Sequence, residues 1–432
     1  MAKIILSINA GSSSVKVSVY STTEGAQDPT QLAEAQVDGL TAPPPTLKYS
    51  RGDEKIKGKK LEGINSQEDA FRYILDHLTN DKGLPELSHR DDIGFACHRV
   101  VHGGDYPKAQ LIDDDTYHHI EKLSDLAPLH NAGALTIVRA VHHELPRASN
   151  IAYFDSSFHS TLPPHVRTYP IDPTVASRNK LRKYGFHGIS YSFITRAVAA
   201  HLAKPLEELN IIALHLGSGA SACAIRGGKS ADTSMGLTPL AGLPGATRSG
   251  SIDPSLIFHF THDAGRPSRQ SSKELHITEA EQILNKKSGW AALTGTTDFG
   301  EVIGRMERGD EMAKLAFDIF VDRIVGFVGS YYLSLEGAVD ALVFAGGIGE
   351  KGGQLREAVA GKAKCLGFEI DEGRNRYVGD GVVEDIGKEG AKHRILVCKT
   401  DEQLEMARRC AAEWAKFKPG TEEVDMPGAF AG

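Results

Sequence analysis

The chain has 432 residues, 41% of them apolar, and a formal net charge of −7. This length allows two or more domains with a sizeable core. The acidic balance argues against a nucleic-acid partner, which would normally meet a basic surface, so a small anionic substrate must be held by local positive groups.

Cysteine spacing and hydropathy bear on the compartment. The five cysteines form no C-x-x-C pair, which favours a reducing environment over a disulfide framework or a zinc site. The apolar run at 4–8 is too short for a signal-peptide core, and no stretch reaches the length of about 18 apolar residues expected for a membrane span. We therefore expect a cytoplasmic chain without a membrane partner.

Two segments share one layout: an apolar strand, a tight Gly/Ser turn and a second strand. They are 4–20 and 210–225, and the repetition indicates an internally duplicated chain. A third segment, 340–352, reads as a buried strand that enters a Gly-rich turn. Strands alternate with helical periodicity, which predicts an α/β architecture. The predicted helices are 66–80, 131–145, 190–203, 277–287, 311–336, 354–365 and 402–418.

The three glycine-rich turns can bring main-chain N–H groups close to a phosphate, because glycine has no Cβ and accepts positive φ. An ordinary hairpin turn is the alternative for any one of them. None fits the Walker A or the dinucleotide-binding pattern. Three such turns in one chain, the first of them flanked by Asn9, Ser12, Ser14 and Lys16, favour a phosphate ligand.

Polar residues follow two predicted strands. Arg99 lies in HRVVHGG (98–104), where it is placed to grip a carboxylate or phosphate with two parallel hydrogen bonds. A metal held by His98 and His102 is the weaker alternative, because that spacing needs a helix. Asp155 ends the apolar strand of NIAYFDSS, where a helix N-cap and a ligand-facing carboxylate are equally good interpretations.

Two further segments point to function. His187 stands between two glycines in YGFHGIS (184–190), which indicates a close approach of the backbone to another group. Segment 232–254 is long, Gly-rich and without periodicity, and such loops inside compact domains are usually functional. Arg248 is its only cation, placed where the loop can fold over an anion.

Taken in order, these stretches resemble the acetate kinase family over nearly the whole chain. The matching blocks are INAGSSSVK (8–16), HRVVHGG (98–104), LAPLHN (126–131), FDSSFH (154–159), YGFHGIS (184–190), HLGSGAS (215–221), DTSMGLTPLAGL (232–243), ATRSGSIDP (246–254), LNKKSG (284–289), FAGGIGE (344–350) and TDEQLEMAR (400–408).

The resemblance implies a two-domain, duplicated fold of the actin, sugar kinase and chaperone-ATPase superfamily, which is actin-like or ribonuclease H-like with an interdomain cleft. Residues 1–155 would form the first domain together with the C-terminal helix 401–418. Residues 156–400 would form the second, with the nucleotide site and a dimer interface, because the family is typically homodimeric. The tail 419–432 is expected to be disordered, and the polar segment 262–274 flexible.

The resemblance also assigns catalytic and acid-binding roles by position. Arg99 would hold the carboxylate of acetate or the anionic end of acetyl phosphate. The catalytic set would be Arg99, Asp155, His187 and Arg248. The pocket for the methyl group would be formed by Val101, Leu129, Phe186 and Pro239.

Metal and nucleotide roles carry over in the same way. Asn9 and Glu402 would support Mg²⁺, with Mn²⁺ as a substitute, because such ions prefer oxygen ligands and keep several waters. ATP or ADP would be bound by residues of the three glycine-rich turns and of one further segment: Ser12, Ser14, Lys16, His215, Leu216, Gly217, Ser218, Gly219, Asp298, Phe299, Gly347, Ile348 and Gly349. His130 also matches a position in the cleft.

The implied reaction is the reversible, direct in-line transfer of a phosphoryl group between ATP and acetate. A carboxylate is ionised at neutral pH, so catalysis should rest on alignment and positive charge. We expect Arg99 and Arg248 to converge on one cavity. Departures from the family pattern at Ser218, Ala246, Gly300 and Lys351 leave the donor open between ATP and pyrophosphate.

Other functions fit the sequence less well. Propionate or butyrate could replace acetate, because one methylene in an apolar pocket is worth only about 1–3 kcal/mol. A non-catalytic nucleotide-binding module would lack an acid pocket. A histidine-based metal hydrolase is disfavoured, because no H-E-x-x-H motif occurs.

Overall fold

A computed structural model describes residues 3–11, 13–24, 26, 28–123, 128–261, 263, 265–269, 271 and 277–417, without the side chains of 128–130 and 132. Ser12, the Leu129 and His130 side chains, six residues of the segment 262–274 and the tail 419–432 lie outside the described residues. The chain forms two compact units: unit 1 holds residues 1–157 and 401–432, and unit 2 holds 158–400.

Unit 1 is built on an eight-stranded sheet in the order β5-β4-β3-β2-β1-β6-β8-β7. Strands β1 to β5 pair antiparallel in sequence order, whereas β1, β6 and β8 are parallel. The strands are β1 Lys3–Ala10, β2 Ser14–Thr22, β3 Thr30–Asp38, β4 Thr46–Arg51, β5 Glu54–Lys60, β6 Ile93–Val100, β7 Gln110–Leu111 and β8 Ser149–Phe154.

Unit 2 repeats the central part of this arrangement. Its six-stranded sheet has the order β11-β10-β9-β12-β14-β13, with β11, β10 and β9 antiparallel and β9, β12 and β14 parallel. The strands are β9 Asn210–Leu216, β10 Ala220–Arg226, β11 Lys229–Thr233, β12 Ala341–Ala345, β13 Val383–Asp385 and β14 Arg394–Cys398. The order β11-β10-β9-β12-β14 matches β3-β2-β1-β6-β8, so the predicted duplication is confirmed.

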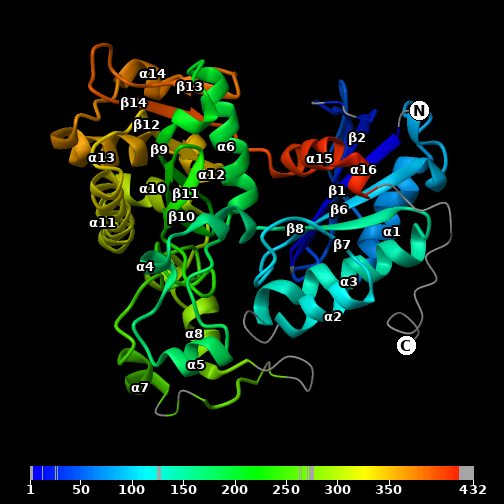
Figure 1. The fold of residues 1–432 in the computed structure, drawn as a ribbon, viewed down its shortest axis with the longest axis horizontal. Coiled ribbons are helices and arrows are strands. Elements are labelled where there is room, and N and C mark those ends of the chain that lie inside the picture. The colour runs from blue at the N-terminus through cyan, green and yellow to red at the C-terminus, as the bar shows by residue number, and fades with distance from the viewer. Residues whose placement is uncertain are drawn as a thin grey trace. The chain divides into compact units, whose positions relative to one another are not determined.

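Helices cover both faces of each sheet (Figure 1). In unit 1, α1 and α3 pack on the face of β1 that carries Ile4, Leu6 and Ile8, and α15 packs on the opposite face. The unit 1 helices are α1 Gln67–Thr79, α2 Asp114–Leu123, α3 Pro128–Glu144, α15 Glu402–Ala412 and α16 Trp414–Phe417.

In unit 2, α10, α11 and α13 share a core with β9, β10 and β12, and α6 lies on the other side of the sheet. The helices are α4 Pro164–Arg167, α5 Pro173–Arg178, α6 Gly188–His201, α7 Leu256–Thr261, α8 Glu279–Lys286, α9 Gly289–Thr294, α10 Phe299–Glu307, α11 Glu311–Ser334, α12 Gly346–Lys351, α13 Gly353–Ala363 and α14 Glu372–Arg376.

Local signals explain why the predicted helices form. In α1, the Ser66 hydroxyl accepts the N–H of Asp69 at 3.0 Å, and apolar residues at helical spacing, among them Phe71 and Leu75, are buried. Each of the seven predicted helices is observed. The last one differs in that it breaks at Glu413, which leaves α15 and α16 as separate pieces.

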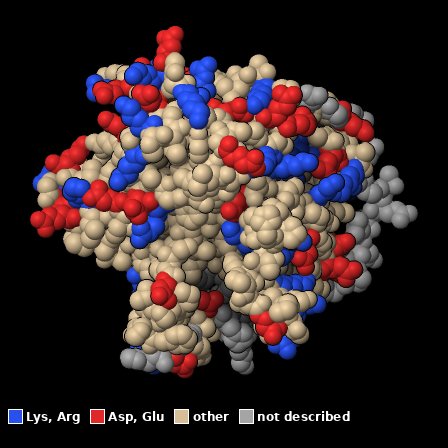
Figure 2. Space-filling view, turned by 60° about the vertical axis from the view of Figure 1, so that its left-hand side comes forward, with Lys and Arg blue, Asp and Glu red and all other residues tan. Residues whose placement is uncertain are grey.

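Charged side chains of both signs are intermixed on the face shown in Figure 2. On that face, attraction of an anionic ligand therefore depends on local cations and not on a single-sign field. In the part of the chain that the structure describes, no helix is both long and apolar enough to cross a membrane.

Candidate active site

Three parallel strands of unit 1 present polar residues at one edge of the sheet. Asn9 lies at the end of β1, Arg99 near the end of β6, and Asp155 directly after β8. The register places Ile8 beside His98 and Val100 beside Phe154, so these carboxyl ends are adjacent. Ligands of α/β folds bind at such edges.

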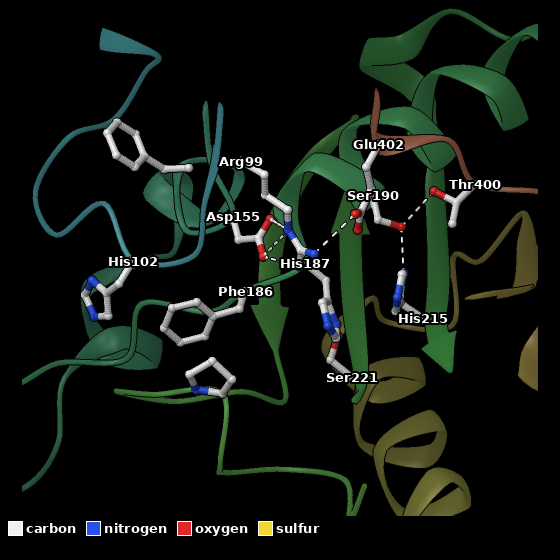
Figure 3. A network of polar contacts seen from close by, with 12 residues as sticks. Arg99, His102, Asp155, Phe186, His187, Ser190, His215, Ser221, Thr400 and Glu402 are labelled. Carbon is white, nitrogen blue, oxygen red and sulfur yellow. Dashed lines mark hydrogen bonds and ion pairs between the residues drawn. The ribbon is translucent and has the colours of Figure 1, made fainter. Parts of the chain in front are cut away.

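Arg99 is held by two carboxylates (Figure 3). Its Nε donates to both oxygens of Asp155 at 3.2 Å, its Nη2 donates to Oδ2 at 2.8 Å, and its Nη1 lies 3.5 Å from Glu402 Oε2. Burial alone would lower the pKa of Arg99, but the charges of Asp155 and Glu402 outweigh it and raise the pKa above its usual value. The guanidinium is therefore permanently charged and fixed in orientation.

The contact between Arg99 and Asp155 was part of neither interpretation of Asp155 made from the sequence. The Asp155 side chain is only 1% exposed and accepts hydrogen bonds from a residue 56 positions earlier. A buried carboxylate of this kind compensates a buried cation. The Asp155 carboxylate therefore holds Arg99 in place.

The C-terminal helix α15 supplies the third member of this cluster. Ser7 Oγ donates to the Gln403 carbonyl at 2.8 Å, and Gln403 Nε2 donates to the Ser7 carbonyl at 3.0 Å. These reciprocal bonds fix the start of α15 on β1. Glu402 is thereby held at the strand edge that carries Asn9, so the two predicted metal ligands lie in one region.

The first hairpin is formed as predicted. Asn9 lies opposite Lys16 in the β1–β2 pair, and the Gly11 N–H donates to the Ser14 carbonyl at 2.9 Å to close the turn. The Lys16 ammonium makes an ion pair with Glu34 on β3 at 2.9 Å. Both side chains are about one-third exposed, and exposed pairs of this kind are weak, so this one can exchange for a phosphate.

The loop after β6 is tied down by buried hydrogen bonds. The His102 N–H donates to Asn131 Oδ1 and its carbonyl accepts from Asn131 Nδ2, both at 3.0 Å. Half-buried Val101 is thus fixed beside Arg99. His98 Nε2 hydrogen-bonds Asn150 Oδ1 at 2.8 Å, and among the described residues no group of three or more His, Cys, Asp or Glu could hold a metal.

In unit 2, the equivalent strands end beside one another in the same way. His215 near the end of β9 pairs with Ala345 at the end of β12, which pairs with Cys398 at the end of β14. After β12 the chain enters the turn at Gly346, where φ is +75° and a Cβ would lie 2.7 Å from the Leu216 carbonyl oxygen. Only glycine fits there.

Two histidines stack at this edge (Figure 3). The rings of His187 and His215 lie 4.2 Å apart. His187 Nδ1 is 2.8 Å from Ser221 Oγ, and His215 Nδ1 is 2.7 Å from Ser190 Oγ, which also contacts Thr400 Oγ1 at 2.8 Å. His187 precedes α6 with a φ of +59°, a conformation that only a few per cent of non-glycine residues adopt.

Arg248 lies close to His187. A Cβ on Gly219 would be 3.0 Å from Arg248 Nη1 and 3.7 Å from His187 Nε2, so both side chains face this glycine. Arg248 Nη1 also donates to the Pro239 carbonyl at 3.4 Å. The structure therefore brings together the unit 2 residues predicted for the transferring phosphoryl group, with Phe186 next in sequence to His187.

A cavity of about 430 Å³ in unit 2 is lined by six of the ten unit 2 residues predicted for the nucleotide. Leu216 and Gly349 are buried outside this lining. Asp298 also caps α10, where Oδ1 accepts the Gly300 N–H at 2.8 Å. The lining is Gly217, Ser218, Thr297, Asp298, Phe299, Gly300, Ile303, Gly347, Ile348, Lys351 and Gly352.

Three of the departures from the family pattern line this cavity: Ser218, Gly300 and Lys351. The fourth, Ala246, is 4% exposed and belongs to the core, while its N–H donates to the Ser218 carbonyl at 2.8 Å. Gly300 and Lys351 also line a neighbouring cavity of about 760 Å³. The two cavities adjoin, because both are lined by Gly300, Ile303, Lys351 and Gly352.

The sequence did not single out the residues that support the site from behind. His159 Nε2 donates to the Phe186 carbonyl at 2.9 Å, and its Nδ1 contacts Ser230 Oγ at 2.7 Å. Burial lowers the pKa of His159 to about 4, so the ring is neutral. Its place in FDSSFH was the one available signal, and nothing in that block indicated its partners.

The family profile described as Acetokinase family matches residues 4–408. The chain belongs to the acetokinase family. A Neurospora crassa protein described as a probable acetate kinase is 56% identical over 444 residues, covering 96% of this chain and 94% of that protein. The resemblance to the acetate kinase family is thereby confirmed, and the solved structures described next confirm the α/β fold class.

Solved structures of acetokinase family members resemble this chain along its length. A propionate kinase from Francisella tularensis has a TM-score of 0.82 at 35% identity, covering 94% of this chain and 98% of that one. The acetate kinase of Porphyromonas gingivalis has a TM-score of 0.80 at 31% identity, with the same coverage. The chain is thus a phosphotransferase of the class that acts on a carboxyl group.

Proposed function

We propose that the chain catalyses reversible phosphoryl transfer between ATP and acetate, giving acetyl phosphate and ADP. The observation that carries this proposal is the 430 Å³ cavity of unit 2, because its lining combines the two predicted glycine-rich turns of that unit with Asp298 and Phe299. Main-chain N–H groups in such turns suit phosphates, and the partly exposed Ile303 and Ile348 of the lining offer an apolar surface to a base.

The charged groups of each unit suit direct transfer. The acetate carboxylate is already ionised at neutral pH, so it can attack the γ-phosphorus without a general base. Unit 1 would bind that carboxylate through Arg99, and unit 2 would donate hydrogen bonds to the phosphoryl oxygens through Arg248 and His187. Arginine and other donors at the transferring group lower the barrier by stabilising charge in the transition state.

Asn9 and Glu402 fit a supporting role for Mg²⁺. An amide oxygen and a carboxylate lie at one strand edge, held there by the bonds between Ser7 and Gln403. Mg²⁺ is commonly bound through one or two carboxylates together with waters and substrate phosphates. The ion would neutralise phosphate charge, and the protein residues would fix its position.

A hydroxamate assay tests the reaction, because hydroxylamine traps acetyl phosphate as it forms. We expect product from ATP, acetate and Mg²⁺, and a loss of about 100-fold or more in kcat for Arg248→Ala. Arg323→Ala, at an exposed position of α11, is the matched control and should leave the rate unchanged. Normal turnover by Arg248→Ala would contradict the assignment.

Which molecule donates the phosphoryl group is a separate question. It concerns the cavity that Gly300 and Lys351 line. A panel of ATP, GTP and pyrophosphate with acetate should give the highest kcat/KM with ATP. Because Lys351 lines the cavity and adds a cation, Lys351→Asn should raise the KM for ATP and leave the KM for acetate unchanged. A preference for pyrophosphate would leave the nucleotide cavity without its proposed role.

Propionate is the second candidate acid, favoured by the 0.82 TM-score to a propionate kinase. We expect kcat/KM to fall from acetate to propionate to butyrate, by a factor of about 10 or more at each added methylene. Equal values for acetate and propionate would favour the alternative. The homodimer and the cytoplasmic location stay predictions, to be tested by light scattering and by cell fractionation.

A further inference from the structure

Behind His187 lies a buried chain of hydroxyl groups that the reaction as proposed does not use. Ser221 on β10 stands opposite His215 on β9, with its Oγ 2.8 Å from His187 Nδ1. On its other side, the Tyr191 hydroxyl lies 2.5 Å from the same Oγ. Ser221 and Tyr191 are both fully buried. Figure 3 shows Ser221 beneath the His187 ring.

The direction of these hydrogen bonds can be read from the far end of the chain. Burial raises the pKa of Tyr191 well above its usual range, so the phenol keeps its proton. The main chain of His215 hydrogen-bonds the phenol, and a main-chain N–H can only donate, so the phenol oxygen is the acceptor in that contact. Because that oxygen accepts from His215, its own proton points to Ser221 Oγ.

The serine then has one proton left to give. Ser221 Oγ accepts from Tyr191, so its hydroxyl proton is directed at His187 Nδ1. An Nδ1 that accepts a hydrogen bond carries no proton, and the neutral imidazole must then carry its proton on Nε2. A second positive charge at this point would also lie close to the Arg248 guanidinium, because both side chains face Gly219.

We propose that Ser221 and Tyr191 are positioning residues that hold neutral His187 in the tautomer with its proton on Nε2. The Nε2 atom is the one that faces Gly219 and Arg248. His187 would therefore act as an N–H donor to a phosphoryl oxygen, without gaining or losing a proton. This function of the tautomer rests on the proposed kinase reaction, whereas the tautomer itself does not.

The elements make this arrangement rigid. Tyr191 lies one helical turn after His187 on α6, and Ser221 lies on the neighbouring strand β10, so the relay joins a helix to the sheet. His187 precedes α6 with a φ of +59°, and its ring contacts Ser221 on β10. A strained backbone is tolerated where the surrounding contacts determine it.

Nitrogen NMR of the full chain labelled with ¹⁵N-histidine tests the tautomer without any assay of activity. The His187 signals are assigned from the spectrum of His187→Gln. We expect an unprotonated Nδ1 and a protonated Nε2 at neutral pH in the wild type, and a mixture of tautomers in Ser221→Ala. A protonated Nδ1 in the wild type would overturn the proposal, whether or not the chain is a kinase.

Kinetics of the same variants test the positioning role. We expect Ser221→Ala to lower kcat by about 10- to 100-fold, less than the loss of a donor itself, with the KM values for acetate and ATP within about twofold. Tyr191→Phe should lower kcat in the same way, and Ser221→Thr, which keeps the hydroxyl, should recover most of it.

Tyr331→Phe is the matched control, because it removes another buried tyrosine hydroxyl of unit 2, one with no hydrogen-bond partner among the described residues. It should leave kcat unchanged. If Ser221→Ala does not fold, Tyr191→Phe carries both readouts. A folded Tyr191→Phe with wild-type kcat and an unchanged tautomer would overturn the relay.

Discussion

Arg99 is kept charged and is also held in a fixed orientation by its two carboxylate partners. Asp155, 1% exposed, accepts hydrogen bonds from Arg99 Nε and Nη2. Glu402, 15% exposed, lies 3.5 Å from Arg99 Nη1. The buried carboxylate therefore fixes the guanidinium plane, and the more exposed one leaves an edge that a substrate carboxylate can approach. Removing Asp155 should change the orientation of the guanidinium, whereas removing Glu402 should change the edge that the substrate approaches. The two contacts can therefore be tested separately.

Asp155→Asn should separate orientation from charge. The amide still accepts a hydrogen bond but no longer neutralises Arg99, so the guanidinium loses its fixed plane. A small misplacement of a binding group can cost about 100-fold in rate. We expect kcat/KM for acetate to fall by about that factor in a coupled ADP assay. Asp53→Asn, in the exposed turn before β5, should have no effect. An unchanged kcat/KM in Asp155→Asn would show that Arg99 needs no anchor.

At the scale of elements, the turn after β9 leaves space for the side chains of Arg248 and His187, because Gly219 has no side chain of its own. The hypothetical Cβ at Gly219 meets the far end of a flexible arginine at 3.0 Å, so an alanine there can be accommodated by a shift of a few tenths of an ångström. The backbone at this position does not have the positive φ that only glycine favours. The turn therefore tolerates a methyl group in folding but not in function.

Gly219→Ala should keep its stability and lose activity. We expect the melting temperature to change little and kcat to fall about tenfold or more, because the displaced guanidinium no longer meets the phosphoryl group. Gly361→Ala is the matched control, since its Cβ on α13 would meet nothing within 4 Å. That variant should keep full activity and gain about 0.5–1 kcal/mol. Equal activities of the two variants would contradict the role given to this turn.

Elements were predictable where their signals are local. The α1 helix follows from the Ser66 cap and the spacing of its apolar residues, and the β1–β2 hairpin from its turn. The contact of Arg99 with Asp155 joins residues 56 apart, and Ser221 reaches His187 across 34 residues. Such contacts depend on strand order and register, which no local pattern contains. Site residues could therefore be named from the family blocks, but not their hydrogen-bond partners.

The whole molecule repeats one design in two units. In each, an antiparallel hairpin is followed by two strands parallel to its first strand, and residues described for the candidate site stand where these parallel strands end: Asn9, Arg99 and Asp155 in unit 1, and His215, Gly346 and Thr400 in unit 2. Each unit also buries a neutral histidine. Burial lowers the pKa of His98 in unit 1 and of His159 in unit 2, each to about 4.

These two histidines make stability depend on pH in a defined window. Between pH 6.5 and 4 the unfolded chain binds protons that the folded chain does not, so stability is complete above the unfolded value and is lost as the pH falls toward 4. Each group can account for up to about 3 kcal/mol at the low end of the window. We expect the urea midpoint to fall steadily between pH 7.5 and 5.

His98→Gln and His159→Gln should each flatten that slope, because a glutamine can make a neutral hydrogen bond at every pH. The variants are compared by their change in midpoint between pH 7.5 and 5, so that any constant loss from imperfect packing cancels. His201→Gln, exposed at the end of α6, should keep the wild-type slope. A wild-type slope in both buried variants would mean that other groups take up the protons, and that the two imidazoles gain no stability from being neutral.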